Sequence, residues 1–404
     1  MKRLYLYDDE RARTFEPFAL TRPVSELRAG AEIIRLRWER AANQKSYGFI
    51  GAPHLADFEE LDAPPFAGNE TTIPAGSVIA ASRFVISLRS SLDDISTAYE
   101  CDGEVCAVRV RKSIDASSLL DGSLALGSLA EHGGGRTSVE GRWLREVWDL
   151  VAQLGDQLGD DIPAIGSTLS GSAIHQATIL GRNPVYCETG AGIEPYVILD
   201  ASDGPILIRR GATIGAFTRI VGPCYIGAES HIIGDAIRAC SIGDVCKVRG
   251  EISSTVMLGH SNKGHTGFVG SSYIGRWVNL GAGTTTSNLK NTYGSVQLWT
   301  PSGLRDTGLQ FLGSMIGDHA KTGIGTMLTT GCVVGAGANI YGSQTTPKYV
   351  PPFAWGDAEP YEQFEPDKFV EVAERMMSRR HVTLSEKGRR LLHQVCAVNG
   401  AAPA

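Results

Sequence analysis

The sequence predicts an α/β domain, a left-handed parallel β-helix and a short α-helical tail, in that order. Three observations predict this. Strand-like and helix-like segments alternate up to about residue 160, a six-residue period then runs from about Ile174 to Ile340, and two amphipathic segments follow Pro352. A chain of 404 residues is too long for one ordinary core. The predicted domains are 1–162, 163–352 and 353–404.

The first part of the chain has the pattern of an α/β domain. Short apolar segments predict strands at 4–7, 47–50, 77–81 and 105–110, and residues 31–42 have helical periodicity. This alternation predicts buried parallel strands. Residues 141–158 predict an amphipathic helix that Asp160, Asp161 and Pro163 are expected to end, so the domain boundary is placed there.

The second part repeats an aliphatic residue every six positions. The pattern runs through Ile208, Ile214, Ile220, Ile226 and Ile232, resumes at Ile242 and Val248, continues at Phe268, Ile274 and Leu280, and ends with Ile316, Thr322, Leu328, Val334 and Ile340. Three hexads form one triangular coil, in which the aliphatic side chain points to the axis and a small residue turns the corner. A glycine-rich loop region with chance spacing does not account for two runs of five matches. Residues 253–267 and 287–309 break the pattern and are expected to form loops.

The tail is predicted to form two helices, at 367–379 and 385–395, with Ser385 as an N-cap. Their expected role is to cap or pack on the end of the solenoid.

Composition restricts the possible functions. The net charge of −6 does not suggest a nucleic-acid partner. The eight cysteines contain no CxxC pair and are expected to be buried thiols in a reducing compartment. No apolar run is long enough for a signal peptide or a membrane span. We therefore expect a cytoplasmic protein with no membrane partner and no resident metal in the β-helix.

A polar cluster lies where the period breaks. It contains His265, Asn279 and Asn288, whose side chains are expected to converge because successive coils stack. A histidine is a natural general base near neutral pH, and an asparagine can hold a substrate or donate to an oxyanion. The alternative is a solvated histidine with two asparagines that form ladders or turns.

The motif around these residues resembles a known family. The segment HTGFVGSSYIGRWVNLGAGTTTSN, residues 265–288, closely resembles the acetyltransferase half of the bifunctional N-acetylglucosamine-1-phosphate uridylyltransferase/glucosamine-1-phosphate acetyltransferase family. The resemblance implies that His265 is the base that deprotonates a sugar amine, that Asn279 contacts the substrate and that Asn288 orients the amine or acetyl group. It also implies acetyl-CoA as acyl donor and a homotrimer, with the donor cleft between neighbouring solenoids.

The sequence departs from the family at the acceptor side. The tyrosine expected three residues after the histidine is Phe268, and the Asn-Tyr-Asp-Gly run is replaced by residues 288–291, NLKN. Basic residues that could contact a sugar phosphate or nucleotide sugar are Lys247, Arg249, Lys263 and Lys290. The acceptor is left open.

The first domain resembles a shortened sugar-1-phosphate nucleotidyltransferase. Residues 19–24, ALTRPV, resemble the stretch after that family's phosphate loop, but the loop position, residues 8–13, has no glycine. The expected metal-binding aspartate is replaced by Ala81-Ser82-Arg83. With its TRPxxxLRxG start and its SNKGH, VNLGAGT and SNLKN motifs, the chain is identified as a member of a GlmU-like group over nearly its whole length. Candidate phosphate-binding cations are Arg13, Arg22, Arg28 and Arg83, and Mg²⁺ is expected only if this domain is active.

Three hypotheses follow. The first is a transferase that moves an acyl group from CoA to an amino-sugar phosphate or nucleotide sugar at the β-helix. The second is a nucleotidyltransferase that joins a nucleotide to a sugar-1-phosphate in the first domain. The third is a non-catalytic scaffold that binds a sugar ligand, with the first domain serving regulation or assembly.

Overall fold

The computed structural model describes residues 3–93, 95–130, 134–342 and 344–399. The chain divides into two compact units, Met1–Val147 with Ser385–Val395, and Trp148–Leu384 with Cys396–Ala404. The predicted boundary at residue 162 lies inside helix α3 (Leu154–Gly166).

The first unit is built on a six-stranded sheet. Its order is β11 (Arg136–Ser138), β8 (Ala98–Cys101), β9 (Glu104–Arg109), β6 (Val78–Ala81), β1 (Leu4–Tyr7) and β4 (Ser46–Ile50). The prediction of parallel strands is correct for β4, β1 and β6 and wrong for β9, which runs antiparallel to β6 and β8. The reason is the turn at Asp102-Gly103, where both residues have positive φ, as the tightest hairpin turns require.

Short elements complete this unit. Helix α1 (Ile34–Ala42) matches the predicted helix and buries Trp38. The remaining strands are β2 (Arg28–Ala29), β3 (Glu32–Ile33), β5 (Thr72–Ile73), β7 (Phe84–Ile86), β10 (Ile114–Asp115) and β12 (Gly141–Trp143).

The helix predicted at 141–158 is partly wrong. Residues Gly141–Trp143 form β12, which pairs antiparallel with β7, and the Trp143 ring lies 4.9 Å from that of Phe84. Helices begin only at α2 (Asp149–Ala152) and α3. Pro163 does not end α3, because Leu158, Ile162 and Ile165 bury a continuous apolar face around it.

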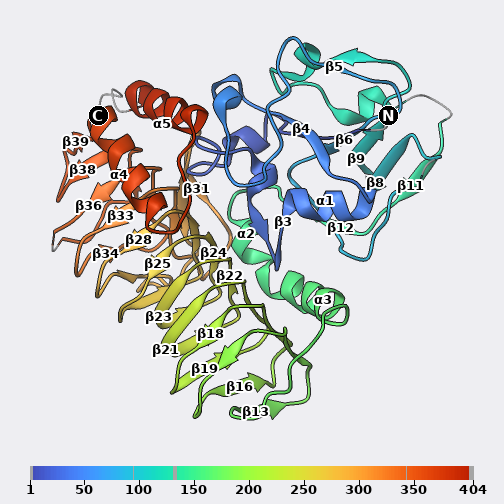
Figure 1. The fold of residues 1–404 in the computed structure, drawn as a ribbon. Coiled ribbons are helices and arrows are strands. Elements are labelled where there is room, and N and C mark those ends of the chain that lie inside the picture. Colours follow the sequence, from blue (N-terminus) through green and yellow to red (C-terminus); the bar gives the residue numbers. More distant parts are fainter. Residues whose placement is uncertain (1–2, 94, 131–133, 343, 400–404) are drawn as a thin grey trace. The chain divides into compact units, whose positions relative to one another are not determined.

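The second unit is the predicted parallel β-helix (Figure 1). One sheet runs β13 (Thr178–Gly181), β16 (Ile198–Ala201), β19 (Thr218–Val221), β21 (His231–Arg238), β23 (Lys247–Ser253), β25 (Asn262–Lys263), β28 (Asn279–Leu280), β33 (Lys321–Thr322), β36 (Asn339–Ile340), β38 (Ala354–Gly356) and β39 (Glu362–Gln363), with β15 (Gly192–Ile193), β18 (Thr213–Ile214) and β26 (Phe268–Gly270) beside it. The other runs β14 (Val185–Cys187), β17 (Ile206–Ile208), β20 (Cys224–Ile226), β22 (Ser241–Ile242), β24 (Val256–Gly259), β27 (Tyr273–Arg276), β32 (Met315–Ile316), β35 (Val333–Val334) and β37 (Tyr349–Val350). Strand β29 (Thr285–Thr286) pairs with β34 (Met327–Leu328).

The hexad residues form the core of the solenoid. The isoleucines from Ile208 to Ile232 are at most 1% exposed, and Ile208 stacks directly under Ile226, eighteen residues later. Later coils are shorter, because Ile226 pairs with Ile242 and Ile242 with Met257. This shortening is the physical reason why the six-residue count fails there.

Two predictions in this region are corrected. Residues 253–267 are not an inserted loop, since they contain β24 and β25 of a regular short coil. Val269, and not Phe268, is the buried core residue, and Phe268 lies outward and partly exposed. Residues 287–309 do leave the coil, and they form the antiparallel hairpin β30 (Gln297–Thr300) and β31 (Gly303–Asp306).

The tail forms two helices, as predicted. Helix α4 (Pro366–Ser378) packs on the last coils, where Phe369 contacts the rings of Phe353 and His319. Helix α5 (Glu386–Asn399) begins after Ser385, whose Oγ accepts from the Gly388 amide as an N-cap does. Residues Ser385–Val395 belong to the first unit, so the predicted packing on the solenoid holds for α4.

All eight cysteines are buried free thiols. No helix in the described part of the chain is long and apolar enough to cross a membrane.

Candidate functional site

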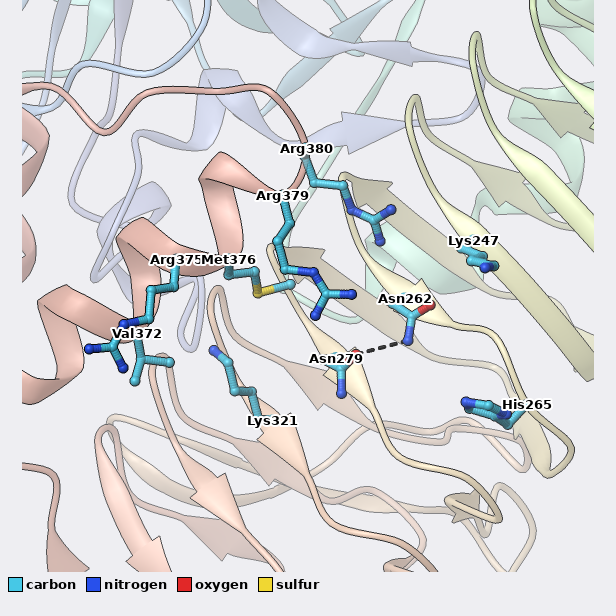
Figure 2. Close-up of a pocket in the computed structure, with 10 residues that line it drawn as sticks. All are labelled: Lys247, Asn262, His265, Asn279, Lys321, Val372, Arg375, Met376, Arg379 and Arg380. Carbon is cyan, nitrogen blue, oxygen red and sulfur yellow. Dashed lines mark hydrogen bonds between the residues drawn. The ribbon is translucent and has the colours of Figure 1, made fainter.

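One pocket joins the β-helix to helix α4. Its volume is 510 Å³, within the usual range for small-molecule sites. The solenoid contributes polar side chains and the tail contributes a largely basic surface (Figure 2). The lining residues are Lys247, Asn262, His265, Asn279, Lys321, Val372, Arg375, Met376, Arg379 and Arg380. His265 and Asn279 therefore meet at one site, as predicted.

The solenoid side of the pocket is a ladder of four polar residues. Strand register pairs Lys247 with Asn262, Asn262 with Asn279, and Asn279 with Lys321. Neighbouring strands lie about 4.8 Å apart, so the two lysines are separated by about 14 Å at their backbones. The ladder thus has an amine at each end and two amides between them.

The two asparagines of the ladder are joined. Asn262 donates from Nδ2 to Oδ1 of Asn279 at 2.8 Å, the contact drawn in Figure 2. Since this bond occupies the Asn279 oxygen, the amide NH₂ of Asn279 is the end presented to a ligand.

His265 is exposed at the corner that follows β25, and the turn that carries it is held from inside the solenoid. The Lys263 ammonium donates to the carbonyl oxygens of His265 at 2.5 Å and Thr266 at 2.9 Å. It also lies 3.5 Å from the carbonyl oxygen of Arg249.

These contacts correct the prediction that Lys263 contacts the substrate. Lys263 is 0% exposed and takes an inward position, in register with the buried Val248 on the neighbouring coil. Burial lowers the pKa of Lys263 to about 8. The lysine therefore acts on the pocket through the backbone of its turn.

Asn288 lies beside the next face of the coil. Its Nδ2 donates to Ser271 Oγ at 3.3 Å. A Cβ added to Gly270 would meet both the Phe268 ring and the Asn288 amide, so these two side chains are neighbours. Asn288 does not line the pocket of His265 and Asn279.

Two other predicted cations lie outside the pocket. Arg249 forms an exposed ion pair with Asp235, with Nε 3.3 Å from the carboxylate. Lys290 donates to the carbonyl oxygen of Ser295 within the inserted segment.

The first unit has its own cluster of charges at the carboxyl ends of parallel strands β1 and β6, where ligands of open α/β sheets bind. Asp8 is buried, accepts from the Val24 amide, and has a pKa raised to about 6 by burial. Asp9 accepts from Arg83 at 2.7 Å. Arg83 also pairs with Glu104 at 2.8 Å.

Comparison with known proteins gives one family match and several partial relatives. Residues 4–168 match the family model described as "Sugar nucleotidyl transferase". A "Bifunctional sugar-1-phosphate nucleotidylyltransferase/acetyltransferase" of Sulfurisphaera tokodaii is 35% identical over 22% of this chain and 23% of its own length. "Bifunctional protein GlmU" of Jannaschia sp. is 30% identical over 43% of this chain and 33% of its own, and that of Desulfitobacterium hafniense is 30% identical over 40% and 38%.

The chain is similar to these bifunctional proteins over part of its length. It spans roughly a quarter to two fifths of the length of these curated relatives. Among solved structures, an N-acyltransferase from Bacillus cereus is similar at 14% identity, with coverage of 50% of this chain and 93% of that chain and a TM-score of 0.21.

Within residues 4–168, which match the sugar nucleotidyl transferase model, the four predicted phosphate-binding arginines have internal partners. Arg22 pairs with Glu60 at 2.7 Å, and Arg83 pairs with Asp9 and Glu104. Arg13 donates to the carbonyl oxygens of Asp8 and Leu120, and Arg28 donates to that of Ala31. Their role in binding phosphate stays a prediction, and a phosphate would have to compete with these partners.

Sequence reasoning missed the tail side of the pocket. Arg375, Arg379 and Arg380 are more than a hundred residues from His265 and belong to no motif. The sequence feature that could have indicated them is the cluster of arginines at the end of a predicted amphipathic helix that follows the solenoid. Asn262 was also missed, although it belongs to the same SNKGH run as Lys263.

Proposed function

We propose that this chain is a transferase that moves an acyl group from CoA to the amino group of a sugar phosphate or nucleotide sugar. The observation that carries the proposal is the pocket in which His265 and Asn279 meet beside several cations. The likeness to bifunctional transferases supports the reaction class.

His265 is the proposed general base. It accepts the proton that the neutral sugar amine loses as its nitrogen attacks the thioester carbonyl carbon. The C–N bond forms, an oxyanion develops on the carbonyl oxygen, and its collapse breaks the C–S bond, so that CoA leaves as a thiol after it gains a proton. The products are an amide and free CoA.

Asn279 is the proposed acceptor-binding amide. Its oxygen accepts from Asn262, so its NH₂ can donate to a substrate hydroxyl or phosphate oxygen. Asn288 is the proposed residue that orients the acetyl group. Because Asn288 lies beside the next face of the coil, acetyl-CoA would have to extend round the corner that carries His265.

Thiol release from acetyl-CoA tests this proposal. The acceptors are a broad panel of amino-sugar phosphates and nucleotide amino sugars. We expect His265→Ala to lower kcat by about 10²–10⁴-fold, the usual contribution of a general base. The matched control is His231→Ala, since His231 is exposed on the same sheet but lies outside the pocket and contacts Thr213. Absence of turnover by the wild type over the whole panel would refute the proposal.

The assembly is proposed to be a homotrimer, because β-helix acyltransferases of the resembling family place the donor between neighbouring solenoids. Light scattering measures it directly, and a monomer would contradict the proposed donor cleft.

A second candidate activity is nucleotidyl transfer by residues 4–168, which the match to the sugar nucleotidyl transferase model favours. Pyrophosphate release from nucleoside triphosphates and sugar-1-phosphates tests it. Asp9 and Glu104 are paired with Arg83, and no described residues form a group of three histidine, cysteine, aspartate or glutamate side chains that could hold a metal ion. If both assays are silent and a nucleotide sugar still binds, the chain is a binding scaffold.

A further inference from the structure

The pocket at His265 concentrates positive charge in an acidic chain. The whole sequence has a net charge of −6, yet five of the ten lining residues are lysine or arginine and none is aspartate or glutamate. Lys247 and Lys321 come from the solenoid, and Arg375, Arg379 and Arg380 come from the tail. Such a concentration of like charges is costly unless an anion offsets it.

Four of these cations have no carboxylate partner. Arg375 pairs with Glu371 at 2.8 Å on the exposed side of α4. Within the described part of the chain, no ion pair involves Lys247, Lys321, Arg379 or Arg380. Lys321 donates to the carbonyl oxygen of His319, and burial lowers the pKa of its ammonium to about 8, which a bound anion would reverse.

The two unpaired arginines face the ladder. They lie at the C-terminal end of α4, and their guanidinium groups project towards Asn262 and Asn279 (Figure 2). Cations at a helix C-terminus often serve the last carbonyl groups. Here the Arg379 and Arg380 side chains instead line the pocket, opposite Lys247 and Lys321.

The spacing of the cations favours an extended anion. The ladder separates the two lysines by about 14 Å at the backbone, and the arginines cover the space between them. A diphosphate carries more charge and a longer set of acceptor oxygens than a single phosphate group, so it can meet more of these cations at once. Arginine forks suit phosphate oxygens because they donate two parallel hydrogen bonds.

We propose that Arg379 and Arg380, with Lys247 and Lys321, bind the diphosphate group of a nucleotide ligand in the His265 pocket. This inference rests on the proposed function, because it names the ligand class of the same site. A diphosphate could come from a nucleotide-sugar acceptor or from CoA. The position beside His265 and Asn279 favours the acceptor, which would then be a nucleotide sugar and not a free sugar phosphate.

Calorimetric titration with inorganic pyrophosphate and inorganic phosphate tests the site without assuming a nucleoside. We expect the full-length wild type to bind pyrophosphate at least tenfold more tightly than phosphate. The double variant Arg379→Ala/Arg380→Ala should lose at least tenfold in affinity for pyrophosphate. Lys368→Ala removes an exposed charge from the same helix outside the pocket and should change the affinity by less than twofold.

Lys247→Met tests the solenoid side independently, should the double variant fail to fold by circular dichroism. It should also weaken pyrophosphate binding by at least fivefold. Unchanged affinity in folded variants, or equal affinity for phosphate and pyrophosphate, would overturn the proposal.

Titrations with UDP and CoA distinguish the two sources. A loss of affinity for UDP in the double variant assigns the diphosphate to the acceptor, and a loss for CoA assigns it to the donor. If neither nucleotide is affected while pyrophosphate is, the pocket takes only inorganic ions and the proposal is wrong. Thiol release by the wild type is measured separately from pyrophosphate binding, so a failure of acyl transfer and a failure of this site give different results.

Discussion

Replacing Lys263 with methionine tests whether a cation inside the solenoid holds the proposed base in place. Lys263 is fully buried at a position where the other coils carry aliphatic residues. Its ammonium donates to the carbonyl oxygens of His265 and Thr266, so the turn that carries the histidine is fastened from within. Methionine has a similar volume and no donor.

The effect on stability is expected to be small, because two contributions oppose each other. Hydrogen bonds from a charged donor contribute about 1.5–3 kcal/mol each, and two short ones are lost. Removing the charge also removes its burial cost, which a fall in pKa from 10.5 to about 8 puts at about 3 kcal/mol at neutral pH. We expect Lys263→Met to lower the free energy of unfolding by about 1–2 kcal/mol.

The effect on activity is expected to be much larger. A displacement of about 1 Å in a reacting group can lower the rate about 100-fold. We therefore expect kcat in the thiol-release assay to fall by about tenfold to 100-fold, with little change in the KM for the acceptor. The control is Ile214→Val, an inward substitution two coils from Lys247 that should cost about 1 kcal/mol and leave kcat unchanged.

Two results would refute this reasoning. If Lys263→Met keeps the wild-type kcat, the carbonyl contacts do not position His265. If kcat falls only in proportion to the folded fraction measured by urea denaturation, the lysine has a structural role alone.

Three further predictions concern stability. The unfolded chain binds more protons than the folded chain between the folded pKa of Lys263, about 8, and the ordinary lysine pKa of 10.5. Urea denaturation tests this through the difference in free energy of unfolding between the wild type and Lys263→Met. This difference should rise with pH across the window, by at most about 1.4 kcal/mol per pH unit. A difference that does not change with pH would contradict the prediction. Arg35→Met removes the buried cation that pairs with Glu26 and Glu39 and should destabilise the first unit by about 3–5 kcal/mol, whereas Arg375→Met, which loses an exposed pair, should cost less than about 1 kcal/mol. Trp277→Ala removes a fully buried ring and should cost the solenoid about 3–5 kcal/mol by the same measurement, so that a loss below about 1 kcal/mol would count against close packing at this corner.

The hexad pattern predicted most of the solenoid because aliphatic side chains repeat where burial requires them. Ile208 to Ile232 are inward, as the period demands. The pattern failed where coils shorten, and there it assigned Phe268 to the core in place of its neighbour Val269. A fixed count of six contains no information about how many residues a corner uses.

The roles of the cations were harder to predict, because an arginine or lysine has the same sequence signal whichever anion it meets. Lys263 was expected to contact the substrate and lies in the core. Arg22 and Arg83 were expected to bind phosphate. In the structure they pair with carboxylates. Arg379 and Arg380 carried no motif, and only the packing of α4 on the last coils brings them to the pocket.

The ladder explains how a distant insertion can leave the site intact. Asn279 and Lys321 are in register on neighbouring strands although the chain between them includes the β30–β31 hairpin. In a parallel stack, the place of an outward side chain depends on its coil and not on the number of residues between coils. The outward residues of the ladder can therefore change from coil to coil without disturbing the buried inward residues. Lys263 is the exception beside this pocket, because its inward side chain donates a hydrogen bond to the backbone carbonyl of the outward residue His265. We therefore expect ligand specificity to follow the ladder and α4, and the position of the base to follow the core.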